Sequence, residues 1–544
     1  MEANTTDDAA SCEVLVVGAG PTGLLAAEEL VRRGVTVRLI ERSTERSTQS
    51  RALVVGARTL EVLDDLGLAE EAVRRGRILH RIDVHPGRDD VVPLELDGID
   101  SPFPFALSLP QPEVVDLLES AAVKRGAVVE RGTELVACRQ DANGVTAELR
   151  MPDGSGQQVR ADWLIACDGA HSDVRRAAGV TADHRDLHRA FLLADVAADW
   201  DLPQDRLHPW LSGHGILVLL PLPETGCWRV IADIPAGGDA PEPDEDMLAR
   251  LLAERTPLPH PEHAVSRVDW LSRFEVRESL AGHYRQGRIL LAGDAAHTHS
   301  PVGGQGMNVG LQDAHNLAWK LALVTHGQAG ARLLDSYEQE RRPVADRVLH
   351  ATARATKVAT LHAPAARTLR HQALRLISRA DPVRHRLALG VTELFVDYEH
   401  SPQVDHDDHD HGSGAGRPGA GDLSPDAFVH DGTGFTTLRH CLRGSDHALL
   451  VLLGYEDDQE TITDVTHAAQ EAVGDFGVVL AVSRTRDRGD LSRSLLGDRH
   501  GACHRAFGAS GPGLCLIRPD RFIAHRSRGW DMAGVRERLA ALSR

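Results

Sequence analysis

Apolar and polar positions near the amino terminus predict a strand, a turn, a helix and a second strand. Residues 13–18 form a compact, largely apolar run that ends in glycine. Over 24–33 the apolar residues recur at helical spacing, and Gly34 follows as a common helix stop. The stretch VTVRLIE then has the composition of a strand. This order is typical of a βαβ unit.

Glycines occupy the turn between the first strand and the helix. Gly18, Gly20 and Gly23 have the GxGxxG spacing, which permits a tight turn and brings a pyrophosphate close to the helix N-terminus. Glu41 ends the second strand, where a carboxylate accepts hydrogen bonds from a ribose. The combination favours a dinucleotide site over a glycine-rich turn without a ligand.

Two later strand ends indicate which dinucleotide is bound. One strand ends in Asp168-Gly169, and another ends in Gly293-Asp294 and continues through Gly303, Gly304 and Gly306 into a helix opened by Met307 and Asn308. Asp294 can bond a sugar or ribityl hydroxyl, and the glycine loop is flat enough for a planar ring. The helix would direct free N–H groups and its positive end at that ring. Reduced flavin carries negative charge near N1 and C2=O, so the pattern favours a flavin over nicotinamide.

The rest of the chain predicts two further structural units. Between 182 and 280, alternating strands predict a sheet-based substrate domain. His214, Trp228 and Arg229 could orient a phenol there, but spacing leaves open which side chains point inward. The run HSPQVDHDDHDHGSGAGRPGAG is typical of a flexible linker, with adventitious metal binding as the alternative. Strands alternating with helices then predict a separate carboxyl-terminal domain.

Composition narrows the classes of partner. The net charge is −19 and the basic residues are scattered, which argues against nucleic acid or an anionic membrane as the main partner and favours a small molecule. The seven cysteines form no CxxC, so we expect buried free thiols in a reducing cytoplasm, with neither a zinc cluster nor disulfides. The first apolar run is too short for a signal segment or a membrane span, so we expect a cytoplasmic protein.

Three motifs carry a family resemblance: GAGPTG, DGAHSDVR and GDAAHTHSPVGGQGMNVGLQDAHNLAWKLA. The sequence resembles the single-component FAD-dependent aromatic hydroxylases, the p-hydroxybenzoate and phenol hydroxylase family, and especially the branch that acts on aromatic polyketides and related antibiotics. The final segment resembles the thioredoxin-like carboxyl-terminal domain of the phenol hydroxylase branch. It lacks CxxC, so we expect a packing or oligomerisation role, compatible with a homodimer, in place of thiol redox chemistry.

The resemblance implies an α/β fold class: a Rossmann-like FAD-binding domain with an inserted sheet-based substrate domain and a C-terminal thioredoxin-like domain. The implied boundaries are 11–181 and 281–398 for the FAD-binding domain, the second part including a helical connection. The remaining boundaries are 182–280 for the substrate sheet domain, 399–416 for the linker and 417–544 for the final domain.

The resemblance also implies the FAD contacts. Glu41 would bind the adenosine ribose, Arg51 the pyrophosphate, Gln111 and Asp294 the ribityl chain, while Asp168 belongs to a motif linked to FAD and NAD(P)H. Arg51 could instead be a surface arginine, Gln111 a helix-start polar residue and Asp168 a turn former. His297 and His299 flank the flavin loop, where structural hydrogen bonding is favoured over a catalytic role. The full set of expected cofactor-binding residues is Gly18, Gly20, Gly23, Glu41, Arg42, Arg51, Gln111, Asp168, Asp294, Pro301, Gly304, Gly306, Met307 and Asn308.

The implied activity is that of a monooxygenase. NADPH or NADH, bound transiently, would reduce FAD, and O2 would give a C4a-hydroperoxide that hydroxylates a polycyclic aromatic ring in a roomy apolar pocket. No protein nucleophile or metal is required. The sequence names no catalytic residue, although a general base that deprotonates the phenol would help. The alternatives are Baeyer–Villiger oxygen insertion or antibiotic-modifying oxygenation by the same flavin chemistry, and a non-catalytic protein that binds FAD or a metabolite. A flavin halogenase is disfavoured because the chain lacks WxWxIP.

Overall fold

A computed structural model gives the fold of the chain. It describes residues 10–47, 52–87, 90–235, 242–299, 304–359, 381–394, 396–404, 417–454, 457–485 and 492–543. The expectations for Arg51, Gly303 and Pro301, and for most of the linker at 399–416, concern residues outside these ranges.

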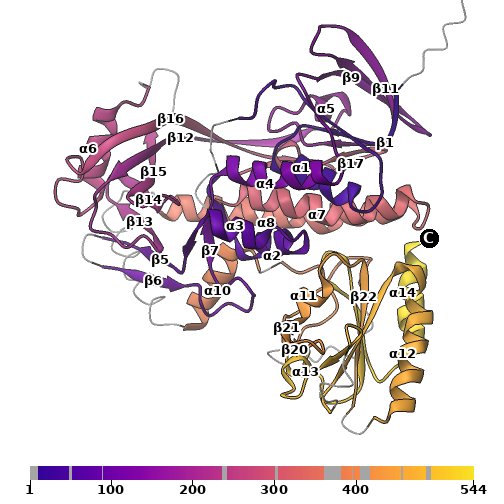
Figure 1. Cartoon of the computed structure of the whole chain (residues 1–544). Coiled ribbons are helices and arrows are strands. Elements are labelled where there is room, and N and C mark those ends of the chain that lie inside the picture. Colours follow the sequence, from indigo (N-terminus) through magenta and orange to yellow (C-terminus); the bar gives the residue numbers. More distant parts are fainter. Residues whose placement is uncertain are drawn as a thin grey trace, which may run out of the picture.

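A largely parallel sheet carries the amino-terminal βαβ unit. β1 lies near its centre, parallel to β2 on one side and to β11 on the other. Parallel neighbours require crossover connections, and α1 (Pro21–Val31) is the crossover between β1 and β2. The sheet, in the upper part of Figure 1, consists of β1 (Ala10–Val17), β2 (Val37–Glu41), β8 (Val129–Arg131), β9 (Glu134–Asp141), β10 (Gly144–Arg150), β11 (Gly156–Ala166), β17 (Arg285–Gln286) and β18 (Ile289–Leu291).

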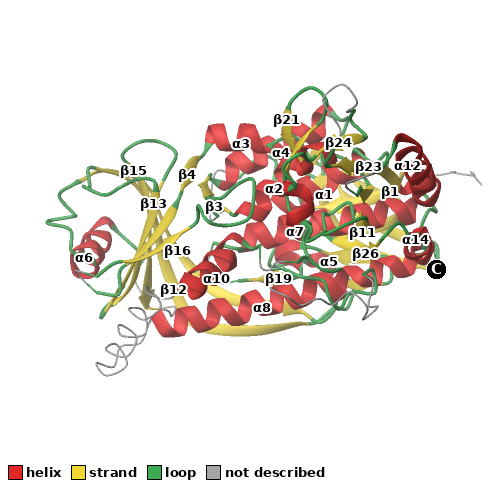
Figure 2. Ribbon diagram, turned by 90° about the horizontal axis from the view of Figure 1, so that it is seen from below, coloured by secondary structure: helices red, strands yellow, loops and turns green. Residues whose placement is uncertain are grey.

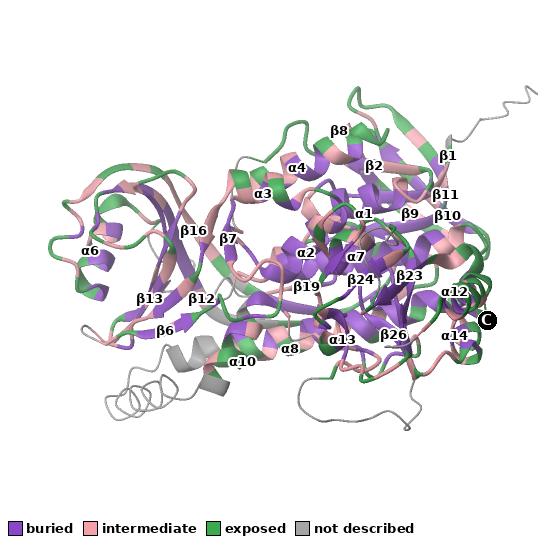
Figure 3. Ribbon diagram, turned by 60° about the horizontal axis from the view of Figure 1, so that its bottom comes forward, coloured by how far each residue is buried: buried purple, intermediate pink, exposed green. Residues whose placement is uncertain are grey.

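Helices pack on this sheet, and the most deeply buried is α7 (Gly306–Thr325). It packs against α1, and its residues from Asn308 to Ala322 are buried, as Figure 3 shows. α8 (Asp335–Ala359) extends from this region along β16 (Figure 2). The other elements of this layer are α2 (Ala57–Asp65), α3 (Ala69–Arg75), α4 (Gln111–Lys124), α5 (Asp173–Ala177), and a small sheet of β3 (Val54–Val55), β4 (Arg77–Leu79) and β7 (Ala106–Ser108).

A second, mostly antiparallel sheet lies to one side. Its longest strands, β12 (Ala182–Ala198) and β16 (Val265–Ala281), have 17 residues each and pair along most of their length. One face packs on α6 (Glu245–Arg255). The sheet is not confined to 182–280, because strands from both flanks join its edges. The remaining elements are β5 (Arg81–Val84), β6 (Val92–Glu95), β13 (Arg206–Ser212), β14 (Gly215–Pro221), β15 (Cys227–Pro235) and β19 (His297–Thr298), with α10 (Asp381–Thr392) packed against β6.

The carboxyl-terminal segment forms a third sheet, drawn in orange and yellow in Figure 1. β22, β23 and β24 are parallel, whereas β25 and β26 continue the sheet antiparallel. Helices pack on both faces, and the α/β fold class expected from the sequence is confirmed. The elements are β20 (Phe428–His430), β21 (Phe435–Thr437), β22 (His447–Leu452), β23 (Gly477–Ser483), β24 (Leu495–Gly497), β25 (Gly513–Ile517), β26 (Ile523–Arg528), α11 (Leu438–Leu442), α12 (Gln459–Val473), α13 (Ala502–Ala506) and α14 (Met532–Leu542).

Buried ion pairs join this third sheet to the first layer. Arg521 donates from Nη2 to Asp65 of α2 at 2.8 Å. Arg518 donates from both Nη atoms to the Glu340 carboxylate of α8, at 2.7 and 2.8 Å. All four side chains are almost completely buried. A buried charge is tolerated only when it is paired, so these contacts fix how the carboxyl-terminal domain docks.

The cysteines and the helices test two simpler expectations. All seven cysteines are free, but only Cys227, Cys503 and Cys515 are buried and the other four are half-buried. Among the described residues, no helix combines the length and apolar character needed to cross a membrane.

We expect Arg521→Met to lower the free energy of unfolding by about 3–5 kcal/mol, because it leaves the buried Asp65 carboxylate without its guanidinium. Arg443→Met is the matched control: Arg443 reaches from the same domain to Asp64, the neighbouring residue on α2, but its side chain is 38% exposed. A pair of this kind contributes about 0–1 kcal/mol. Urea denaturation compares the two variants, and equal losses would contradict the assignment.

Candidate active site

The amino-terminal glycine turn is packed against the end of β11. Gly18 has φ +102°, and a Cβ there would lie 2.4 Å from the Cys167 carbonyl oxygen. A Cβ on Gly23 would lie 1.9 Å from the Gly18 carbonyl oxygen. By contrast, a Cβ on Gly20 would meet no atom within 4 Å. Gly18 and Gly23 are therefore required for backbone packing, while Gly20 leaves open space beside the turn.

Two helix N-termini meet at one cavity. α1 begins after Gly20 and α7 begins after Gln305, and neither helix has a side chain that caps its first turn. Residues 20–22 and 304–307 line the same cavity. Uncapped first-turn N–H groups and the positive end of the helix dipole both favour an anionic or electron-rich ligand. The structure thus brings together Gly20, Gly304, Gly306 and Met307 as expected.

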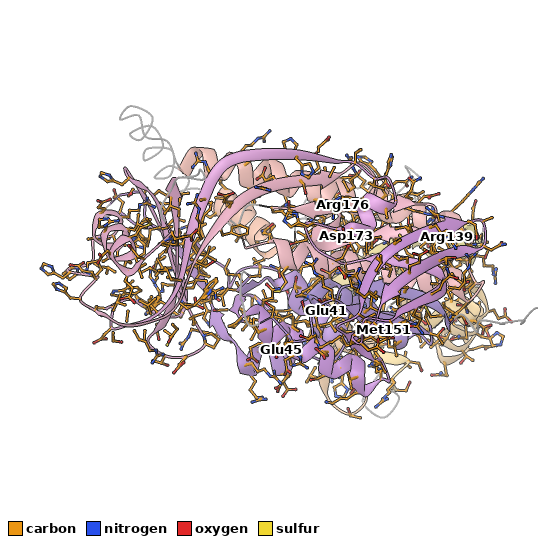
Figure 4. The ribbon with its side chains drawn as sticks, turned by 90° about the horizontal axis from the view of Figure 1, so that it is seen from above. Glu41, Glu45, Arg139, Met151, Asp173 and Arg176 are labelled. Carbon is orange, nitrogen blue, oxygen red and sulfur yellow. The ribbon has the colours of Figure 1, made fainter. Side chains whose placement is uncertain are left out.

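Glu41 lies at the end of β2, where Figure 4 labels it. Its carboxylate accepts hydrogen bonds from the backbone N–H groups of Ala19 and Ser43, both at 2.9 Å. It therefore ties the strand end to the glycine turn. Arg42 is exposed and is not among the residues that line the cavity.

The two aspartates at the strand ends differ in position. Asp168 accepts hydrogen bonds from the Ser172 hydroxyl at 2.5 Å and the Val174 N–H at 3.1 Å, and burial raises the pKa of its carboxyl group. It organises the start of α5, while Gly169 and the two residues after it line the cavity. Asp294 is exposed and lines the cavity itself, as does Gln111, the first residue of α4.

Asn308 holds the glycine loop in place. Its side-chain oxygen accepts the Gly56 N–H at 3.1 Å, and its amide donates to the carbonyl oxygens of Val54 and Gly304 at 3.0 and 3.1 Å. The side chain is buried and outside the cavity lining. The role it has in this structure is to fix the loop before α7 against β3.

The cavity has a volume of about 1940 Å³, larger than the roughly 300–1,000 Å³ of an ordinary ligand pocket. It extends from the glycine turn to the second sheet. The wall formed by the second sheet includes an apolar patch of Phe191, Val218, Ile231 and Phe274. Charged residues of β15 and β16 line the cavity beside this patch: Arg229, Arg273, Glu275, Arg277 and Glu278. The volume suits a dinucleotide together with a second, apolar ligand.

Strand register decides which polar candidates on β15 reach the cavity. Arg229 lines it, with its guanidinium bonded to both Asp195 oxygens at 2.7 Å. Trp228, one residue earlier, is buried in the cluster on the opposite face of the sheet, because successive side chains alternate between faces. His214 does not line the cavity.

A hydrogen-bonded chain runs inward from the cavity wall. His299 Nε2 lies 2.8 Å from His297 Nδ1, and His297 Nε2 lies 2.6 Å from Asp313 of α7. Asp313 also accepts from Arg341 Nε at 2.8 Å. Both histidines therefore make side-chain hydrogen bonds. Asp313 and Arg341 were not anticipated, because their partners are distant in sequence and the motif letters alone do not reveal the contact.

A second buried acid lies close to this chain. Glu393 has φ +60° and accepts a hydrogen bond from Gln312 of α7. Burial raises the pKa of its carboxyl group to about 8. Glu393 is therefore largely protonated at neutral pH.

These features fit FAD on structural grounds. The glycine turn and α1 can hold a pyrophosphate, Asp294 can bond a hydroxyl, and the uncapped first turn of α7 offers backbone N–H groups to a planar ring. The apolar sheet face remains for a second ligand.

Comparison with known proteins gives an independent result. The family model described as an FAD binding domain matches residues 11–352. The 6-methylpretetramide 4-monooxygenase of Streptomyces rimosus is 35% identical, covering 97% of this chain and 93% of the relative. The pentachlorophenol 4-monooxygenase of Sphingobium chlorophenolicum is 30% identical, covering 97% and 96%.

Solved structures agree over the whole chain. The anhydrotetracycline hydroxylase of Streptomyces rimosus has a TM-score of 0.77 at 30% identity and covers 98% of this chain and 99% of its own. Aklavinone-11 hydroxylase, solved with FAD and aklavinone, has a TM-score of 0.76 at 26% identity and covers 98% of each chain.

We expect Gly20→Val to weaken FAD binding by at least about tenfold, a free-energy cost of about 1.4 kcal/mol, because its side chain would enter the cavity. Gly98→Val is the matched control: a Cβ there also meets no atom within 4 Å, but Gly98 is not among the cavity-lining residues. Titration of the deflavinated proteins with FAD, followed by flavin fluorescence, measures both affinities. Equal FAD affinities of the two variants would show that the pyrophosphate does not bind beside Gly20.

We expect Glu393→Gln to flatten the pH dependence of stability. The folded protein keeps this proton up to a pKa of about 8, whereas unfolded glutamate loses it at its ordinary value, so unfolding free energy falls as pH rises between them. Glutamine cannot ionise, and the variant should gain relative stability by about 1.4 kcal/mol per pH unit in that interval. Urea denaturation at several pH values tests this, and parallel profiles would show that Glu393 does not titrate there.

Proposed function

Because the chain belongs to the family of single-component FAD-dependent monooxygenases, we propose that it uses NAD(P)H and O2 to hydroxylate a polycyclic aromatic compound of the polyketide type. The observation that carries this proposal is one continuous cavity. Its walls join the glycine turn and the two uncapped helix ends to the apolar face of the second sheet.

The two ends of the cavity differ in their lining, which supports a separate role for each end. Gly20, Gln111, Asp294 and the loop at 304–307 would hold FAD. Bound FAD would supply the redox chemistry that takes electrons from NAD(P)H and activates O2. The protein residues then contribute binding, orientation and the exclusion of water from the apolar end.

The substrate class rests on the sheet wall and on the relatives. Phe191, Val218, Ile231 and Phe274 present an apolar surface, and Arg229 places a paired cation beside it. An aromatic ring system with polar oxygens fits this surface. Relatives are named for 6-methylpretetramide and aklavinone. The proposal includes a cytoplasmic location, in keeping with seven free cysteines.

We expect NADPH to bleach the flavin absorbance slowly under anaerobic conditions and much faster when a suitable polycyclic phenol is present. The panel is anhydrotetracycline, aklavinone and hydroxyanthraquinones. Acceleration by one compound supports a substrate-gated hydroxylase, and equal rates with and without every compound would contradict it. Product analysis with labelled O2 then separates hydroxylation from oxygen insertion.

A pair of variants locates the substrate in the same experiment. Val218→Trp fills part of the apolar end and should raise the concentration of compound needed for acceleration by at least about tenfold. Val136→Trp makes the same change on β9, where the side chain is 52% exposed and outside the cavity lining. It should behave like the unaltered protein.

A further inference from the structure

The hydrogen-bonded chain behind the cavity wall ends in an atom without a partner. The ring of His299 lines the cavity, and its Nε2 is bonded to His297. Its Nδ1 is buried and has no hydrogen-bond partner among the described residues. Buried polar atoms are normally satisfied, so an exception beside a ligand cavity points to a ligand group as the missing partner.

The carboxylate at the inner end sets the direction of the hydrogen bonds. Burial disfavours ionisation of Asp313, but the hydrogen bonds from His297 and Arg341 and the positive charge of Arg341 act against it, and the pKa of the carboxyl group lies below its ordinary value. Ionised Asp313 only accepts, so His297 donates through Nε2. When the proton of His297 is on Nε2 alone, its Nδ1 accepts from His299 Nε2, which leaves a lone pair on His299 Nδ1.

Building on the proposed function, we propose that His299 is a catalytic residue that accepts the hydroxyl proton of a phenolic substrate. The phenol O–H bond breaks, its electron pair stays on oxygen, and an N–H bond forms at His299 Nδ1. The His299 Nε2–H proton passes to His297 Nδ1. The added proton therefore rests on His297 beside ionised Asp313, and the substrate becomes a phenolate, whose ring is more electron-rich.

This relay agrees with the electrostatics of the two rings. Burial, together with His297, lowers the pKa of His299 well below its ordinary value, so His299 disfavours a positive charge. In the relay His299 is neutral before and after transfer, because it gains one proton and loses another. His297 carries the charge at 2.6 Å from the Asp313 carboxylate. His297 and Asp313 are positioning residues.

Other ionisable groups lie near the relay, and the test must distinguish their effect on the phenol from that of His299. Tyr284 stacks on His297 with ring centres 6.1 Å apart, and burial raises its pKa well above the ordinary value, so it stays neutral. Arg277 and Glu278 of β16 line the cavity, and Arg341 is bonded to Asp313. Glu393 also interacts with Asp313, and Glu393→Gln tests its contribution separately.

The test uses the FAD-loaded protein and the panel compound that accelerates flavin reduction. Without NAD(P)H, absorbance reports the pH at which the bound phenol ionises. We expect this midpoint to be at least about one pH unit higher in His299→Gln than in the unaltered protein. His299→Asn should show the same shift, whereas His467→Gln, altered on an exposed part of α12, and Glu393→Gln should not.

Kinetics give a second readout. Near neutral pH, kcat of His299→Gln should fall by about 10²-fold and recover once the pH exceeds the phenol's own pKa, while KM and FAD content stay within about threefold. If the His299→Gln variant loses FAD, the His299 side chain serves cofactor binding and not proton transfer, and the proposal is overturned. An unchanged midpoint would also overturn it.

A proton-release measurement tests the relay on the unaltered protein, without any substitution. When the compound binds as phenolate in a weakly buffered solution, a pH-indicator dye should detect no released proton, because the relay retains it. Release of one proton per bound phenolate would overturn the relay while leaving the hydroxylase function intact. If no compound accelerates flavin reduction, the proposed function itself fails, and the relay with it.

Discussion

The polar side chains buried along α7 constrain the rest of the structure. A helix in the interior must satisfy every polar group it buries, because an unpaired one costs about 1–3 kcal/mol. Four of the buried polar side chains of α7 bond to residues outside this helix. Gln312 bonds Glu393, Asp313 bonds His297 and Arg341, His315 bonds Glu29 of α1, and Lys320 bonds Glu340 of α8. The position of α7 is thereby fixed relative to both sheets.

This constraint has a direct consequence for the cavity. The N-terminus of α7 and the N-terminus of α1 line the same space, and the bond between His315 and Glu29 at 3.0 Å ties the two helices together. Asn308 fixes the loop that precedes α7. The dipole ends that would face a bound flavin are consequently held by rigid, buried contacts, as preorganised electrostatic sites require.

The same network reaches the carboxyl-terminal domain. Asn316 of α7 donates to both Glu340 and Asp520, and Arg518 bonds the same two acids. Lys320 shares Glu340, and burial lowers its pKa to about 8. A docking surface built from buried charges is specific in geometry, since displacement would leave several charges unpaired. Buried charges therefore hold the carboxyl-terminal domain against α7 and α8.

The sequence by itself determined the amino-terminal βαβ unit, the α/β class and the family, because strand, turn and helix signals act over a few residues. It also identified Gly20, Gln111, Asp294, Gly304, Gly306 and Met307, all of which line one cavity. Only the tertiary structure decided that Arg229 faces this cavity while Trp228 does not, since pairing register sets the face of each side chain. Only it brought Asp313, Arg341 and His297 together, because contacts between distant segments depend on how whole elements pack.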